Sequence, residues 1–97
     1  MFEWDEEKRK LTLLKHGIDF VDAAEILLAP HIVVAGSSEQ EVRKIAIGDL
    51  AGITIAVVFT IRGNNYRLIT ARRARRDERE KYQALLFGRY PKNEGPN

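Results

Sequence analysis

The sequence contains no cysteine, and this absence excludes disulfide bonds and zinc sites built from thiolates. Its two histidines are not accompanied by paired carboxylates, so we expect no metal cofactor. Long apolar runs are missing as well, and the longest, around residues 53–59, is far too short to span a bilayer. The first residues, Met-Phe-Glu-Trp-Asp, lack the basic-then-apolar order of a signal peptide, and we therefore expect a cytoplasmic protein.

The length of 97 residues and the apolar content of 44% indicate a single folded domain, which we place at residues 1–88. Residues 89–97 contain proline, glycine and asparagine and are expected to form a flexible tail. Residues 1–59 carry six Lys or Arg and ten Asp or Glu, whereas residues 60–97 carry ten and four. A basic half on a nearly neutral chain suggests a polyanionic partner; the alternative is a solvated helix that is rich in arginine.

Capping residues and apolar spacing predict two helices near the N-terminus. Asp5 begins a first helix that buries Leu11 and Leu14 and ends at Gly17. Asp19 caps a second helix. The apolar face of this second helix and its end are marked by Phe20, Ala23, Ala24, Leu27 and Pro30.

The rest of the chain is predicted to be mostly β-structure. Strands are expected at residues 2–4, 31–35, 42–47, 53–60 and 66–72, and a last helix follows residue 76 and ends at Gly88. The order β-α-α-β-β-β-β-α predicts an α+β domain, in which the helices pack against one face of an antiparallel sheet. The opposite face, or its rim, is then left for a ligand.

Seven arginines lie between residues 62 and 79, and two of them interrupt a segment with the composition of a β-hairpin. Arginine within a strand loses solvation unless it meets an anion or reaches the sheet edge, and clustered guanidinium groups suit a phosphate. If Gly63 and Asn64 form a two-residue loop, Arg62 and Arg67 lie on one face, whereas a three-residue loop separates them. Regular alternation places Arg72 on the face opposite Arg67, unless a bulge near the strand end re-orients it.

Two sequence patterns occur in this chain. The first, FEWD followed by KHGI.F, begins at Phe2, and the second, R....R.I.AR.A...ER..Y, begins at Arg62; Arg43 lies between them. Together they cover residues 2–83 and resemble the BrnT family of small bacterial toxins, whose fold is similar to that of RelE-type ribonucleases. Thr12 and Thr70 depart from the family, which usually has Asn and Ser at these positions.

The resemblance implies a metal-independent endoribonuclease toxin that needs no cofactor, cleaves RNA and arrests translation or growth. It also implies an antitoxin encoded beside the toxin, typically a BrnA-like ribbon-helix-helix protein that binds DNA. The toxin–antitoxin complex would repress its own promoter through the antitoxin, with no role for a membrane.

RNA carries its own nucleophile, the 2′-OH, so the enzyme must orient it, move two protons and stabilise the extra charge on the phosphate. A guanidinium cannot readily accept a proton, so Arg62, Arg67 and Arg72 are electrostatic candidates; an ion pair with a carboxylate is the alternative for each. His16 is the acid/base candidate, because histidine both accepts and donates protons near neutral pH. Its alternative role is to cap the dipole of the first helix.

The remaining candidates also have structural alternatives. Lys15 is a phosphate contact, a second proton donor or a solvated surface lysine. Tyr82 donates a proton, stacks on a base or belongs to the core. Glu78 pairs with a nearby arginine, with a role as base left open. We expect a cluster of arginines at the start of the last helix to attract the phosphates of RNA: Arg73, Arg75, Arg76 and Arg79.

Two other functions remain open from the sequence. One is an RNA- or DNA-binding module without catalysis, whose binding weakens as salt rises. The other is an antitoxin-binding subunit whose basic face contacts an acidic partner.

Overall fold

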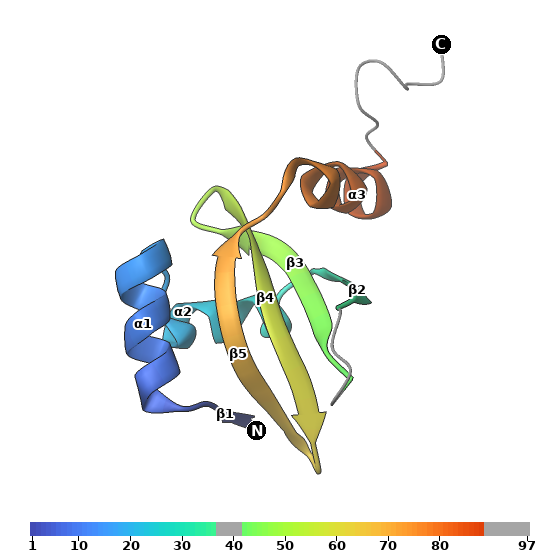
Figure 1. Cartoon of the computed structure of the whole chain (residues 1–97). Helices are drawn as coiled ribbons and strands as arrows, with labels where there is room; N and C mark the ends of the chain where they lie inside the picture. The colour runs from blue at the N-terminus through green and yellow to red at the C-terminus, as the bar shows by residue number, and fades with distance from the viewer. Residues whose placement is uncertain (37–41, 89–97) are drawn as a thin grey trace.

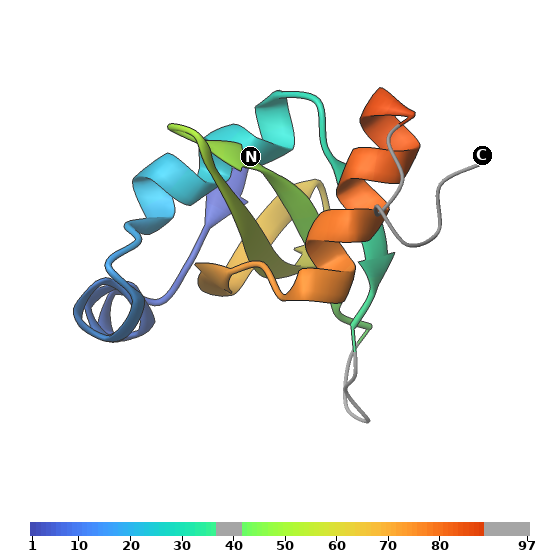
Figure 2. The same ribbon diagram turned by 90° about the horizontal axis from the view of Figure 1, so that it is seen from above.

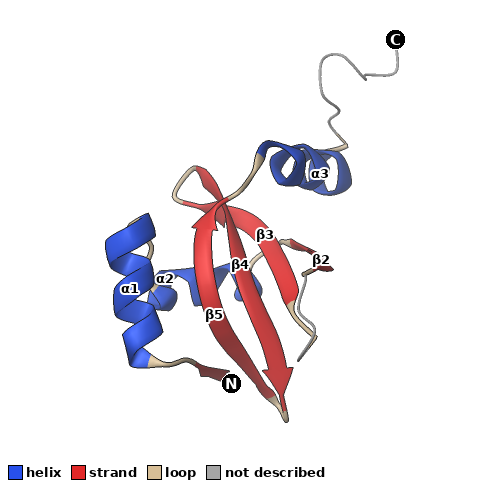
Figure 3. Ribbon diagram, viewed as in Figure 1, coloured by secondary structure: helices blue, strands red, loops and turns tan. Residues whose placement is uncertain are grey.

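The computed structural model describes residues 1–36 and 42–88, which form an α+β domain with a five-stranded sheet (Figures 1 and 3). The predicted α+β class is therefore confirmed, whereas the expected tail at 89–97 lies outside the described residues. Within the described ranges, none of the helices combines the length and apolar character that a bilayer crossing requires. The elements are β1 (Phe2–Glu3), α1 (Glu6–His16), α2 (Phe20–Ala24), the 3-10 helix η1 (Glu25–Leu28), β2 (Ile32–Ala35), β3 (Lys44–Leu50), β4 (Ile53–Arg62), β5 (Asn65–Arg73) and α3 (Arg76–Phe87).

The sheet is mixed, which corrects the expectation of an antiparallel sheet. Strands β2 to β5 form an antiparallel meander, whereas β1 pairs with β5 in parallel, with Phe2 opposite Tyr66. The helices carry the chain from β1 to the far edge of the sheet, and three reversals bring β5 back beside β1 in the same direction (Figure 1). Because β1 pairs only with Tyr66 and Arg67, the rest of this edge of β5 faces α1.

Both ends of α1 lie where its capping residues predict them. Asp5 accepts a hydrogen bond from a backbone N–H of the first turn, and Gly17 ends the helix with a left-handed φ of +71°. The predicted burial of Leu11 and Leu14 is wrong, because these side chains are 61% and 85% exposed while Thr12 is buried. The helix lies along the edge of β5 and not over the sheet (Figure 1), so only a narrow stripe of it contacts the rest of the domain.

Helices cover both faces of the sheet, which corrects the expectation that they pack against one face. A cluster of buried side chains closes the face under α2 and η1. Five of its members are at most 2% exposed: Phe20, Ile26, Ile55, Val57 and Leu68. Helix α3 lies on the opposite face (Figure 2), where Ala74 and Tyr82 pack with Ile32, Ile47 and Ala56. Residues 74–75 carry the chain across the end of β5, and this turn brings the apolar side of α3 onto the second face.

The β4–β5 hairpin has the predicted two-residue loop, Gly63–Asn64. Arg62 pairs with Asn65 and Thr60 pairs with Arg67, so the expected register at the loop is confirmed. Arg62 and Arg67 therefore lie on the same face of the sheet, as residues on opposite strands do in this register.

A bulge in the middle of the hairpin changes the face of the side chains that follow it. The register shifts between the first and second halves of β5, and Ile69 is the extra residue. Leu68 and Ala71 consequently both enter the core under α2, although they are three residues apart. Thr70 and Arg72 join Arg67 on the second face. Regular alternation, which places Arg72 opposite Arg67, is therefore wrong, and the alternative of a bulge is observed, although the bulge lies in the middle of the hairpin and not near the strand end.

Candidate functional site

Three arginines line a cavity of about 210 Å³ on the second face of the sheet, beside the N-terminus of α3. Arg43 precedes β3, Arg72 lies near the end of β5, and Arg75 is the N-cap residue of α3. Thr70 adds a hydroxyl to this lining. Three guanidinium groups and a hydroxyl supply the positive charge and the hydrogen-bond donors that a phosphate needs. We refer to this pocket as the arginine cavity; Gly36, Ile45 and Val58 also line it.

Glu78 fixes the orientation of Arg72 at the wall of the arginine cavity. Arg72 donates from Nη1 to Oε1 at 2.7 Å and from Nη2 to Oε2 at 3.0 Å, and the Glu78 side chain is only 9% exposed. Glu78 also accepts a hydrogen bond of 2.8 Å from the backbone N–H of Arg75, so it caps α3 and ties the helix to β5. The predicted pairing of Glu78 with an arginine is confirmed.

The ion pair between Arg72 and Glu78 shifts the pKa values of both groups and so favours their charged forms. The hydrogen bonds from Arg72 are the main cause of a lowered pKa of Glu78, against the opposing effect of burial. The hydrogen bond to Glu78 likewise raises the pKa of Arg72. A carboxylate with a lowered pKa is a poor base, so Glu78 positions Arg72 and does not accept a proton at neutral pH.

Arg72 retains a second edge for a ligand. A guanidinium has two edges that can each donate two parallel hydrogen bonds. Glu78 occupies the edge formed by Nη1 and Nη2, and Nη1 also contacts the carbonyl oxygen of Arg73 at 3.3 Å. Within residues 1–36 and 42–88, Nε makes no hydrogen bond. The edge formed by Nε and Nη2 can therefore bind two oxygens of a phosphate.

A groove of about 610 Å³ runs between α1 and the outer edge of β5. Lys8, Lys15 and His16 line it from α1, and Ile69 of the bulge lines it from β5. Thr70 lines both this groove and the arginine cavity, so the two spaces adjoin at its side chain. The end of α1 thus places an imidazole and an ammonium group next to the arginine cavity.

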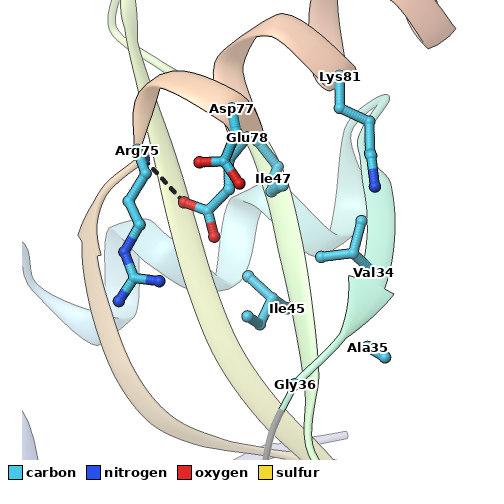
Figure 4. Close-up of a pocket in the computed structure, with 9 residues that line it drawn as sticks. All are labelled: Val34, Ala35, Gly36, Ile45, Ile47, Arg75, Asp77, Glu78 and Lys81. Atoms are coloured by element: carbon cyan, nitrogen blue, oxygen red, sulfur yellow. Dashed lines mark hydrogen bonds between the residues drawn. The ribbon is translucent and has the colours of Figure 1, made fainter.

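A further cavity, of about 460 Å³, lies between α3 and strands β2 and β3 (Figure 4). It shares Gly36, Ile45 and Arg75 with the arginine cavity. The two cavities are therefore neighbours on the same face of the sheet. The remaining residues that line it are Val34, Ala35, Ile47, Asp77, Glu78 and Lys81.

Arg62 and Arg67 lie on the same face toward the hairpin loop, and neither lines the arginine cavity. Arg67 donates from Nη1 to Oε2 of Glu3 at 2.8 Å, and this hydrogen bond is the main cause of a lowered pKa of Glu3. The contact joins β1 to β5 at the sheet edge. The ion-pair alternative is thus observed for Arg67, as it is for Arg72.

Two predicted site residues, Tyr82 and Arg73, do not line the arginine cavity. Tyr82 is buried under α3 and contacts Phe87 edge to face, with ring centroids 5.6 Å apart. Burial raises the pKa of Tyr82, and its place in the core matches the structural alternative. Arg73 points to the other face of the sheet, where it lines a separate cavity together with His16 and Asp22.

Arg76 and Arg79 lie on the outer surface of α3. Arg76 forms an ion pair of 3.2 Å with Glu80, and Arg79 donates a hydrogen bond of 2.8 Å to the carbonyl oxygen of Ala74. Both side chains belong to exposed residues. They are available for long-range attraction of a polyanion, but they do not line the arginine cavity.

Arg43 and Thr70 are absent from the site residues that the sequence predicts, although both line the arginine cavity. A signal for Arg43 existed, because it belongs to the family pattern and continues the alternation of Ile45 and Ile47 along β3. The signal for Thr70 was weaker: the family usually has Ser, another hydroxyl, at this position. Regular alternation, which omits the bulge, places Thr70 with Leu68 on the face opposite Arg67.

Comparison with known proteins identifies the family of this chain. A family described as "Ribonuclease toxin, BrnT, of type II toxin-antitoxin system" matches residues 4–78, a span that includes all residues of the arginine cavity. No curated protein matches the chain. The chain therefore belongs to the BrnT family, the ribonuclease toxins of type II toxin-antitoxin systems, for which RNA is the substrate and an antitoxin is the partner.

Proposed function

We propose that this protein is a metal-independent endoribonuclease toxin that uses the 2′-OH of RNA as nucleophile and arrests translation or growth. One observation carries the proposal: a cavity lined by Arg43, Arg72 and Arg75 adjoins, through Thr70, a groove that contains His16. The cavity supplies charge stabilisation, and the groove supplies a group that can move protons.

The scissile phosphate binds in the arginine cavity. The second edge of Arg72 contacts two of its oxygens, and Glu78 keeps that edge in place. Negative charge on the phosphoryl group grows as the 2′-oxygen attacks, so arginines that are fixed beforehand stabilise the transition state more than the substrate. Each such contact typically contributes about 2–4 kcal/mol when water is excluded.

Proton transfer is assigned to the end of α1. The 2′-OH loses its proton as its oxygen bonds to phosphorus, and the 5′-oxygen gains a proton as its bond to phosphorus breaks. His16 lies in the groove that reaches the cavity at Thr70 and performs one of these transfers. Lys15, beside it, serves as a phosphate contact or as the second proton donor. The products are a 2′,3′-cyclic phosphate and a 5′-hydroxyl end.

The other arginines bind or attract RNA outside the cavity. Arg62 and Arg67 follow the same sheet face toward the hairpin loop and contact phosphates next to the scissile one. Arg73, Arg76 and Arg79 increase the rate of encounter through their charge. Tyr82 supports α3 from the core and takes no part in the reaction.

We further propose that the partner is a BrnA-like ribbon-helix-helix antitoxin, that the complex binds promoter DNA through it, and that both proteins act in the cytoplasm. Exposed Leu11 and Leu14 border the groove together with Lys8 and Lys15. Such a surface complements an antitoxin segment that combines apolar and acidic side chains. We expect Leu14→Glu to abolish co-purification with the co-expressed antitoxin, because it adds a negative charge to a surface that would bind acidic side chains; retained co-purification would refute this contact.

Cleavage of a 5′-labelled RNA in excess EDTA tests the reaction. The protein is compared with an Arg75→Ala variant and with Arg76→Ala as a matched control, because Arg76 lies outside the cavity on the same helix. We expect discrete fragments from the wild-type protein and the control, with 2′,3′-cyclic phosphate ends, and little cleavage by Arg75→Ala.

Other results would favour other functions. Intact RNA with salt-dependent binding would indicate a nucleic-acid-binding module without catalysis. Intact RNA without binding near 150 mM salt, together with tight antitoxin association, would indicate a pure interaction subunit. Equal cleavage by all three proteins would place the site elsewhere or reveal a contaminating nuclease.

A further inference from the structure

The cavity between α3 and strands β2 and β3 combines an apolar floor with a charged rim (Figure 4). Val34 pairs with Ile45, and both side chains lie on the face under α3, with Ile47 next to them. Asp77 and Lys81 are one turn apart on α3 and border the same space. A flat ring whose faces are apolar and whose edge carries donors and acceptors matches such a lining.

We propose that this cavity binds a nucleobase of the RNA, adjacent to the scissile phosphate, and that Asp77 selects a base with an exocyclic amino group. The inference rests on the proposed function, because it takes the arginine cavity as the phosphate site. It adds a determinant of base preference that lies outside the reacting groups.

The position of the cavity links it to the phosphate site. Gly36, Ile45 and Arg75 line both cavities, so the two spaces share a wall. In a nucleotide only the ribose lies between the phosphate and its base. A phosphate held by Arg72 and Arg75 therefore brings a neighbouring base to the floor formed by Val34 and Ile45.

The rim carries polar groups that are available for a ligand. Glu78 is engaged by Arg72 and by the backbone N–H of Arg75. Asp77 and Lys81, in contrast, make no hydrogen bond or ion pair within the part of the chain that the structure describes. One is a pure acceptor and the other a pure donor at neutral pH.

This pair discriminates between bases through their edges. Adenine, cytosine and guanine each present an amino group beside a ring nitrogen or carbonyl, so the amino group can donate to Asp77 while Lys81 donates to the neighbouring acceptor. Uracil has no amino group, and its one free N–H lies between two carbonyl oxygens. A carboxylate that accepts from this N–H is close to both oxygens, and Lys81 can offset the repulsion of only one of them. We therefore expect uracil to be disfavoured at this position by about tenfold, the effect of one hydrogen bond to a charged group.

Mapping of cleavage sites in a random-sequence RNA tests the proposal. The wild-type protein, Asp77→Asn and the control Glu80→Gln are compared at equal total cleavage, since Glu80 lies on α3 outside this cavity. We expect one position next to the cut to disfavour uracil in the wild-type and control profiles and to accept it in the Asp77→Asn profile. Identical profiles for all three proteins would overturn the proposal.

A binding measurement separates this inference from the proposed reaction. Short 2′-O-methyl RNAs that differ in one base cannot be cleaved by their own 2′-OH, and the difference between their affinities reports base recognition without cleavage. An affinity difference between cytosine and uracil that disappears in Asp77→Asn supports the base site even if no cleavage is ever seen. An unchanged base profile combined with weakened antitoxin binding by Asp77→Asn would overturn it in favour of a protein side chain in this cavity.

Discussion

The two faces of the sheet differ in what covers them and in what they leave exposed. Under α2 and η1 the face is closed by buried side chains, such as Phe20 and Val57. Under α3 the cover is partial, and the uncovered part carries Thr70, Arg72 and the arginine cavity. One face therefore supplies most of the apolar burial that stabilises the domain, while the other can hold charged side chains that stability alone would not favour.

The largest expected effect is on the closed face. Replacing Phe20 by Ala removes a fully buried ring and should lower the free energy of unfolding by about 4 kcal/mol. Val21→Ala on the same helix is the control, because Val21 is 50% exposed and its loss should cost less than about 0.5 kcal/mol. Urea denaturation measures both values. Similar losses for the two variants would show that this face is not the stabilising one.

The next largest effect concerns the ion pair that holds α3 to β5. Glu78→Gln should lower the free energy of unfolding by about 3 kcal/mol at pH 7, because it leaves Arg72 without its charged partner. The folded-state pKa of Glu78 is lowered from its ordinary value of 4.5, so its stabilising effect is present above pH 4.5 and is lost as the pH falls through the folded-state pKa.

The difference in the free energy of unfolding between the wild-type protein and Glu78→Gln should therefore become smaller in acid. Urea denaturation at a series of pH values measures this. Glu80→Gln, which breaks only an exposed pair with Arg76, is the matched control. A stability difference that stays constant down to pH 2.5 would contradict the assigned role of the Arg72–Glu78 pair.

A catalytic effect without a loss of stability is expected at the N-cap of α3. Arg75→Ala should lower kcat/KM for RNA cleavage about 100-fold, corresponding to one charged contact in the transition state. Stability should change by less than about 0.5 kcal/mol, because the backbone N–H of Arg75, and not its side chain, bonds to Glu78. If Arg75→Ala lowered the free energy of unfolding as much as Phe20→Ala does, Arg75 would serve stability, and the two faces would not differ in function.

The smallest expected effect is at the hairpin end of the same face. Arg67→Ala should lower cleavage less than about tenfold. It should also reduce the slope of log K for RNA binding against log salt concentration by roughly one, as expected for a flanking phosphate contact. Arg67 is already paired with Glu3, which weakens its contribution to RNA binding. Measurement of kcat/KM and of affinity over a salt series checks this. A loss as large as that of Arg75→Ala would move the reaction centre toward the hairpin loop.

Local signals in the sequence predicted the elements well. Asp5, Asp19 and Gly17 mark helix ends in the structure because a cap depends on residues within one turn. The two-residue loop Gly63–Asn64 and the pairing next to it also follow from a short segment. The candidate site was predicted in part: Arg72 and Arg75 line the arginine cavity, and His16 and Lys15 line the adjoining groove.

Long-range contacts decided what these local signals could not. Leu11 and Leu14 have helical spacing typical of a core, yet they are exposed because α1 lies at a sheet edge. The bulge at Ile69 has no marker in the residues around it, and it alone brings Arg72 to the face of Arg67. Alternation along a strand predicts one face only until an extra residue reverses it.

The sequence by itself determined the class of the fold, the family and the set of charged residues from which a phosphate site can be built. These properties depend on composition, on short-range capping and on motifs that are read along the chain. Tertiary structure decided which of the arginines meet, because Arg43, Arg72 and Arg75 come from three elements joined only by strand pairing and by the packing of α3. Packing free energy depends on contacts between residues far apart in sequence, and no local pattern contains that information.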